Sequence, residues 1–155
     1  MKSKKLNLLV TNIFKKHGLS NQHAKISSSA LINAELVGAY GHGLSRLKMY
    51  CDRILKKVIN PKPKIKIKKV SQSIYHIDAN NSIGFVAADL AIKTAIKSAK
   101  KTGIGMVAVK NSGHYGLSGY YAEQAVKKNL ITMIYTNAPP AVAPHGALKS
   151  LFGTN

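Results

Sequence analysis

The chain has 155 residues, of which 45% are hydrophobic, and its 24 lysines and arginines against five acidic residues give a net charge of +19. The length allows one domain with a real core and excludes two ordinary ones, and the apolar fraction excludes wholesale disorder. The charge would usually indicate a nucleic-acid or anionic-membrane partner, but Arg46 and Arg53 are the only arginines, and specific nucleic-acid readers depend on the planar arginine fork.

The other basic residues are lysines scattered over almost every segment, which is typical of solvated faces. We therefore expect no specific nucleic-acid partner. The single cysteine, Cys51, excludes an internal disulfide and fits a reducing compartment. The apolar run from Leu8 to Val10 is too short for a signal peptide, and no run approaches membrane-spanning length. These features predict a cytoplasmic protein without a membrane partner.

Helical spacing of apolar residues dominates residues 1–60, which we interpret as one helical segment. Glycine, proline and small polar residues mark where its helices begin and end. The predicted helices are residues 4–17, ending at Gly18; a second, capped by Ser20 or Asn21 and breaking by Gly41; and a third from Gly43 through Leu55, ended by Pro61 and Pro63.

The character of the chain changes in residues 61–155, where alternating and continuous apolar runs predict strands. The first strand is decorated with lysines, as expected of a sheet edge. The last two apolar strands, with a helix between them, indicate a right-handed crossover in a covered sheet. The predicted elements are strands at residues 65–70 and 74–78, whose spacing suits a hairpin; a long helix from Gly84; a strand from Ile104 to Val109; a helix at residues 117–127; and a strand from Leu130 to Tyr135.

These elements predict an α/β fold: an N-terminal helical segment followed by a mixed sheet with covering helices. The final residues include the apolar pair Leu151 and Phe152, which we expect to pack against something further on. The second part therefore resembles the start of a larger sheet, and we interpret residues 61–155 as the first part of an incomplete α/β domain.

His42, Arg46 and Tyr50 recur at four-residue intervals in the third predicted helix. At that spacing the side chains project from one helix face, so an imidazole and a guanidinium could converge on one ligand. Arginine can hold a carboxylate with two hydrogen bonds while histidine exchanges a proton with a carbinol oxygen, which suits a 2-hydroxy or 2-keto acid. The alternative is a helix terminus with an exposed histidine and a surface arginine.

His114 directly follows an apolar strand and has Gly113 and Gly116 beside it. In α/β sheets the strand ends are where ligands commonly bind, so His114 is a candidate proton-handling residue. The alternative is a turn whose histidine caps the next helix. No metal site is predicted, and no GxGxxG dinucleotide motif lies between a strand and a helix.

Four segments of the chain resemble the malate/L-lactate dehydrogenase type 2 family of oxidoreductases, which includes ureidoglycolate, sulfolactate and diketogulonate enzymes. The resemblance runs from about residue 20 to the end, in the family's order and spacing, and covers only the N-terminal half of the family pattern. The matching segments are GHGLSRL with Tyr50 after it, VAVKNSGHYGLSGYYA, TNAPPAVAPHG and LFGTN.

The resemblance implies an NAD- or NADP-dependent 2-hydroxyacid dehydrogenase with a non-Rossmann fold, generally a homodimer. His114 and His42 both match histidines given the acid–base role in family members, and we favour His114. The other implied site residues are Arg46 and Tyr50 for the substrate, and Thr136, Asn137 and Ala138, largely through backbone groups, for the nicotinamide.

The chain departs from the family pattern at Gly41, where a serine is usual, and near Val37, where an arginine is usual. The length of the chain also differs from the family pattern, because family members are about twice as long. The sequence therefore predicts a fragment, a truncated gene product or one half of a split gene. The competing hypothesis is a non-catalytic remnant, or a half that needs a partner chain.

Overall fold

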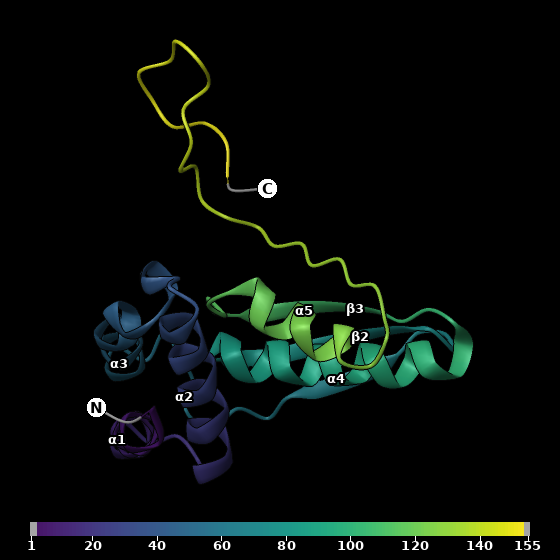
Figure 1. Ribbon diagram of the computed structural model, residues 1–155, viewed down its shortest axis with the longest axis horizontal. Helices are drawn as coiled ribbons and strands as arrows, with labels where there is room; N and C mark the ends of the chain where they lie inside the picture. Colours follow the sequence, from purple (N-terminus) through teal and green to yellow (C-terminus); the bar gives the residue numbers. More distant parts are fainter. Residues whose placement is uncertain (1–2, 154–155) are drawn as a thin grey trace.

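The computed structural model describes residues 3–153, which form helices at one end and a three-stranded sheet at the other (Figure 1). Two short 3₁₀ turns, η1 and η2, lie between the second and third α-helices. The elements are α1 (Ser3–Lys16), α2 (Asn21–Leu36), η1 (Tyr40–His42), η2 (Leu44–Arg46), α3 (Leu47–Leu55), β1 (Lys66–Lys69), β2 (Ile74–Ser82), α4 (Gly84–Thr102), β3 (Met106–Ser112) and α5 (Ser118–Val126).

The first two helices form as predicted. Ser20 is the N-cap of α2, and its hydroxyl accepts the His23 backbone N–H at 3.1 Å, which satisfies one of the unpaired amides of the first turn. α1 and α2 pack through buried side chains that include Phe14 and Leu31. Ser28 also donates to the Asn7 carbonyl oxygen at 2.8 Å, which links the two helices.

The sheet has the order β1–β2–β3, with β1 antiparallel and β3 parallel to β2. This confirms the predicted mixed sheet, and β1 is an exposed edge strand as its lysines indicated. α4 connects the parallel pair and contacts both strands, so β2–α4–β3 is the crossover unit of the fold. α5 contacts α4 and α2, which extends the same helical layer (Figure 1).

The third predicted helix differs from the structure at both ends. Gly43 has an extended ψ of −141°, so two separate 3₁₀ turns precede α3, and the Glu35 carboxylate accepts the Leu44 N–H at 3.0 Å. At the other end Lys57 adopts a left-handed φ of +59°. The helix therefore ends at Leu55, before either proline is reached.

The prediction of a buried strand pair after α4 is wrong for the described residues. β3 forms as an edge strand that pairs only with β2, and Met106 on it is 58% exposed. Within the described part of the chain, residues 130–135 pair with no strand and form none themselves. Ile131 is 96% exposed and Met133 is 74% exposed. An apolar run becomes a strand only when a neighbouring strand accepts its backbone hydrogen bonds.

The chain after α5 extends away from the sheet, as the yellow-green trace in Figure 1 shows. This segment contains a short antiparallel bridge between Val142 and Phe152, in which the backbone N–H of each residue donates to the carbonyl oxygen of the other at 3.0 Å. None of the helices found between residues 3 and 153 has the length and apolarity to cross a bilayer.

Candidate active site

The loop that carries His114 lies directly over the beginning of α4. Gly84, the first residue of α4, is buried against this loop, and a Cβ on Gly84 would overlap the carbonyl oxygens of Gly113 and His114. Only glycine allows such an approach between backbones. The contact holds His114 at the carboxyl ends of the parallel strands β2 and β3, the position predicted from its sequence context.

Tyr50 joins α3 to this loop. Its hydroxyl lies 2.6 Å from His114 Nδ1, although 64 residues separate the two in sequence. The Tyr50 side chain is fully buried, and its ring packs against Phe85 with the centroids 4.8 Å apart. The hydrophobic core, to which Tyr50 and Phe85 belong, therefore fixes the position of Tyr50 relative to His114.

The backbone amide of Gly116 makes a second contact with the same histidine nitrogen, donating to His114 Nδ1 at 3.2 Å. Gly116 has a φ of +80°, and a Cβ there would lie 2.7 Å from Phe85 Cε1. Both the left-handed backbone and the close ring require glycine at this position. Phe85 thus supports both groups that contact His114 Nδ1.

His42 lies beside His114, with the ring centroids 5.7 Å apart and the planes inclined by 20°. Arg46 is exposed, and its Nε donates to the Gly41 carbonyl oxygen at 2.8 Å. The structure therefore brings His42 and Tyr50 to His114, with Arg46 close enough for its charge to act on both Tyr50 and His114. The predicted helical spacing is not the reason, because His42 and Arg46 occupy separate 3₁₀ turns.

The surroundings keep His114 neutral at pH 7. Partial burial against Tyr50 lowers the pKa of His114, and the nearby charges of His42, Arg46 and Arg53 lower it further. Burial raises the pKa of Tyr50 well above that of a free tyrosine, against the opposing effect of the two arginines. The site therefore presents a neutral imidazole beside a protonated phenol.

Sequence reasoning missed Arg53 as a member of this cluster. Arg46, Tyr50 and Arg53 follow the spacing of one helical stripe, i, i+4 and i+7. That spacing, together with the scarcity of arginine in the chain, was the available signal. Both arginines act electrostatically on His114 and Tyr50, so the cluster suits an anionic ligand.

The predicted cofactor residues lie elsewhere in the structure. Thr136, Asn137 and Ala138 belong to the extended segment after α5, which runs away from the helices and the sheet in Figure 1. Thr136 Oγ1 donates to the Asn137 carbonyl oxygen at 3.3 Å, and Ala138 lies against Gly153. The structure does not bring these three residues to the histidine cluster.

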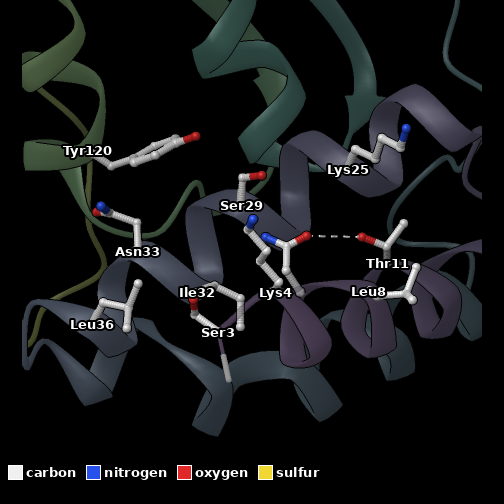
Figure 2. A pocket seen from close by; sticks show the side chains of 11 residues that line it. Ser3, Lys4, Leu8, Thr11, Lys25, Ser29, Ile32, Asn33, Leu36 and Tyr120 are labelled. Carbon is white, nitrogen blue, oxygen red and sulfur yellow. Dashed lines mark hydrogen bonds between the residues drawn. The ribbon is translucent and has the colours of Figure 1, made fainter. Parts of the chain in front are cut away.

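A groove of about 560 Å³ lies between α1 and α2, with Tyr120 of α5 at one side (Figure 2). It contains none of the predicted site residues. The basic side chains along this groove are Lys4 and Lys25, and none of its lining residues is a histidine or a carboxylate. The lining residues are Ser3, Lys4, Asn7, Leu8, Thr11, Lys25, Ser29, Ile32, Asn33, Leu36 and Tyr120.

The lowered histidine pKa values predict a loss of stability in mild acid. Burial lowers the pKa of His23 as well as that of His114. As the pH falls through the unfolded-state value of about 6.5, the unfolded chain takes up protons that the folded chain does not, so unfolding becomes easier. The urea midpoint should be lower at pH 5 than at pH 7, and His114→Gln should reduce the difference. An unchanged or higher midpoint at pH 5 would contradict this prediction.

Taken together, the loop after β3 of a parallel β–α–β unit carries His114 to His42 of η1 and Tyr50 of α3, with the Arg46 charge nearby. This defines an α/β domain with a candidate acid–base site. The chain belongs to the malate/L-lactate dehydrogenase family, whose sequence model matches residues 1–155. This confirms the resemblance seen in its motifs.

Characterised relatives and solved structures agree with this assignment. The chain is 44% identical to a malate dehydrogenase of Pyrococcus abyssi over 94% of this chain and 40% of the relative. It is 39% identical to an L-sulfolactate dehydrogenase of Methanocaldococcus jannaschii over 95% of this chain and 43% of the relative. The structure of a malate dehydrogenase from Pyrococcus horikoshii matches 98% of this chain and 44% of that chain, with 36% identity and a TM-score of 0.89. The chain thus spans less than half the length of the relatives it matches.

Proposed function

We propose that the chain carries the acid–base and substrate-binding part of an NAD- or NADP-dependent 2-hydroxyacid dehydrogenase. The observation that supports this most is the meeting of His42, Tyr50 and His114 within range of the Arg46 charge. These groups come from η1, α3 and the loop after β3, so their approach depends on the fold. The names of the relatives, which include malate and sulfolactate dehydrogenases, indicate the substrate class.

In this proposal Arg46 binds the carboxylate of the acid and thereby orients C2. Rotation away from the Gly41 carbonyl oxygen frees the whole guanidinium for two parallel hydrogen bonds. His114 is the favoured acid–base residue, because Tyr50 and the Gly116 amide both contact its Nδ1, whereas His42, the alternative, stacks beside it. Tyr50, predicted to line the substrate pocket, would contribute to it through its contact with His114 at Nδ1.

The fold bears on how a nicotinamide cofactor would bind. Nucleotide-binding folds commonly hold a diphosphate at an open helix N-terminus, but the carbonyl oxygens of Gly113 and His114 cover the start of α4 at Gly84. The described residues therefore do not fit a diphosphate there, which supports the proposed non-Rossmann mode. The histidine cluster supplies the acid–base and carboxylate-binding groups of the reacting end, whereas Thr136–Ala138, which the resemblance assigns to the nicotinamide, lie apart from His114 in this structure. When bound, the cofactor exchanges a hydride with C2 of the acid.

Relatives named for NAD(+) and for NADP(+) both occur, so the proposal covers both cofactors. We further propose that residues 1–60 act as a helical support and that residues 61–155 are the first part of the cofactor-binding domain. A homo-oligomer, or a polypeptide matching the remaining length of the relatives, would complete the site. The exposed apolar side chains of β3 and residues 130–135 favour this second candidate, an enzyme half that needs a further chain.

Cofactor binding tests the proposal directly. Titration of the purified chain with NADH and NADPH, followed by fluorescence, should show saturable binding that becomes tighter when a 2-keto acid is present. Arg46→Gln should abolish the effect of the keto acid, because the bidentate carboxylate contact is lost. Lys48→Gln is the matched control, since Lys48 is an exposed neighbour whose Nζ contacts Asp52, and it should leave the effect unchanged.

The outcomes separate the two candidates. A folded chain that binds neither cofactor would contradict the proposal that this chain alone forms the site, and would favour the enzyme half. If the chain binds the cofactor saturably, but Arg46→Gln and Lys48→Gln change the effect of the keto acid equally, the proposed carboxylate-binding role of Arg46 is contradicted.

A further inference from the structure

We infer that Tyr50 is a positioning residue that, together with the Gly116 amide, holds His114 in the tautomer with its proton on Nε2, so that the site is prepared to bind a 2-keto acid. The inference rests on the proposed function for its choice of ligand. Its core, the position of one proton on His114, depends on two hydrogen bonds.

The Gly116 contact decides the direction of hydrogen bonding at His114 Nδ1. A backbone N–H can only donate, so the Gly116 N–H, 3.2 Å from Nδ1, requires a lone pair on that nitrogen. A proton on Nδ1 would point at the Gly116 N–H and leave the amide without its acceptor. A neutral imidazole carries one proton, which must then be on Nε2.

Tyr50 strengthens the same assignment. A phenol can donate or accept, but toward a nitrogen with a lone pair it donates, and the short 2.6 Å separation indicates a strong bond. Burial keeps the Tyr50 hydroxyl protonated, so it has a proton to donate. The ring cannot turn aside easily, because it is fully enclosed and packs against Phe85.

The consequence is that Nε2 of His114 acts as a hydrogen-bond donor toward a ligand. Both hydrogen bonds that the His114 side chain makes within residues 3–153 are at Nδ1, which leaves Nε2 available to a ligand, and the residue as a whole is exposed. An Nε2–H donates to a carbonyl oxygen, which a 2-keto acid provides. A carbinol oxygen can also accept from Nε2–H, but the hydroxyl proton of a 2-hydroxy acid then has no acceptor at this nitrogen, whereas a carbonyl group carries no proton. The free site is therefore matched to the keto form.

The histidine tautomer can be measured by long-range ¹H–¹⁵N NMR on the ¹⁵N-labelled chain without cofactor or substrate. We expect a protonated-type shift for Nε2 of His114 and an unprotonated-type shift for Nδ1. In Tyr50→Phe the separation of these two shifts should shrink, because one donor to Nδ1 is lost and the other tautomer gains population. Tyr115→Phe is the matched control, since the Tyr115 hydroxyl contacts Ser118 in the same region, and its spectrum should match the unaltered chain at His114.

A proton on Nδ1 in the unaltered chain would overturn the inference, and this result needs no variant to fold. A Tyr50→Phe spectrum identical to the unaltered one, from a folded variant, would overturn the role of Tyr50. Because no cofactor is present, a failure to bind NADH in the separate titration leaves this test unaffected. Binding of a keto acid and of its hydroxy acid with equal affinity at pH 7 would contradict the preference for the keto form.

Discussion

The His114→Ala variant is expected to reduce 2-keto acids roughly 10²–10⁴-fold more slowly than the unaltered chain, the range that a positioned acid–base group contributes. Among the described histidines, His114 is the one that combines a strand-end position with two hydrogen bonds at Nδ1 and an exposed side chain. The measurement is the initial rate of NADH or NADPH oxidation at saturating keto acid. Removing the side chain should leave the folded state in place, which circular dichroism would check.

Two further variants make this test specific. His76→Ala removes an exposed histidine on β2 and should leave the rate unchanged. His42→Ala should have a smaller effect than His114→Ala, since His42 only stacks beside the reacting imidazole. A larger loss in His42→Ala than in His114→Ala would transfer the acid–base role to His42.

The Phe85→Ala variant is expected to lose about 3–5 kcal/mol of unfolding free energy, which is the usual cost of removing a buried phenylalanine. Phe85 is 0% exposed, and its ring supports Tyr50 on one side and the Gly116 backbone on the other. Domains of this size have about 5–15 kcal/mol in total, so the loss is a large part of the stability. Urea unfolding followed by circular dichroism measures it.

Phe152→Ala provides the matched control for this prediction. Phe152 is 55% exposed on the extended segment, so its removal should change the unfolding free energy by less than about 0.5 kcal/mol. Equal effects of the two substitutions would mean that Phe85 does not hold the core beneath the site.

Local sequence was sufficient where a structural feature depends on neighbours in the chain. Ser20 caps α2 because its hydroxyl reaches an amide three residues away. The lysines of β1 mark an edge strand because they must remain solvated. His114 follows a strand at a glycine-rich turn, and the turn residues alone indicate a ligand-binding loop.

The candidate site shows where this reasoning fails. The apolar spacing predicted a third helix from Gly43, but Glu35, from another helix, accepts the Leu44 amide and the chain forms two 3₁₀ turns before α3. The apolar run at residues 130–135 predicted a strand, yet no strand among the described residues pairs with it. Both errors arise because a segment's local preference is small compared with the contacts that the rest of the fold supplies or withholds.

The sequence by itself determined the family, the α/β class and the order of the elements as far as α5, apart from the two 3₁₀ turns, and it named the candidate acid–base and carboxylate-binding residues, because each depends on residue type and short-range spacing. Only the tertiary structure decided that Tyr50 and His114 meet, and that Gly116 and Phe85 support the contact. Those residues lie on segments far apart in the chain, and no periodicity records which distant segments will pack together. The proton on Nε2 of His114 follows from that packing, since one backbone N–H and one phenol, brought together by the fold, both point at Nδ1.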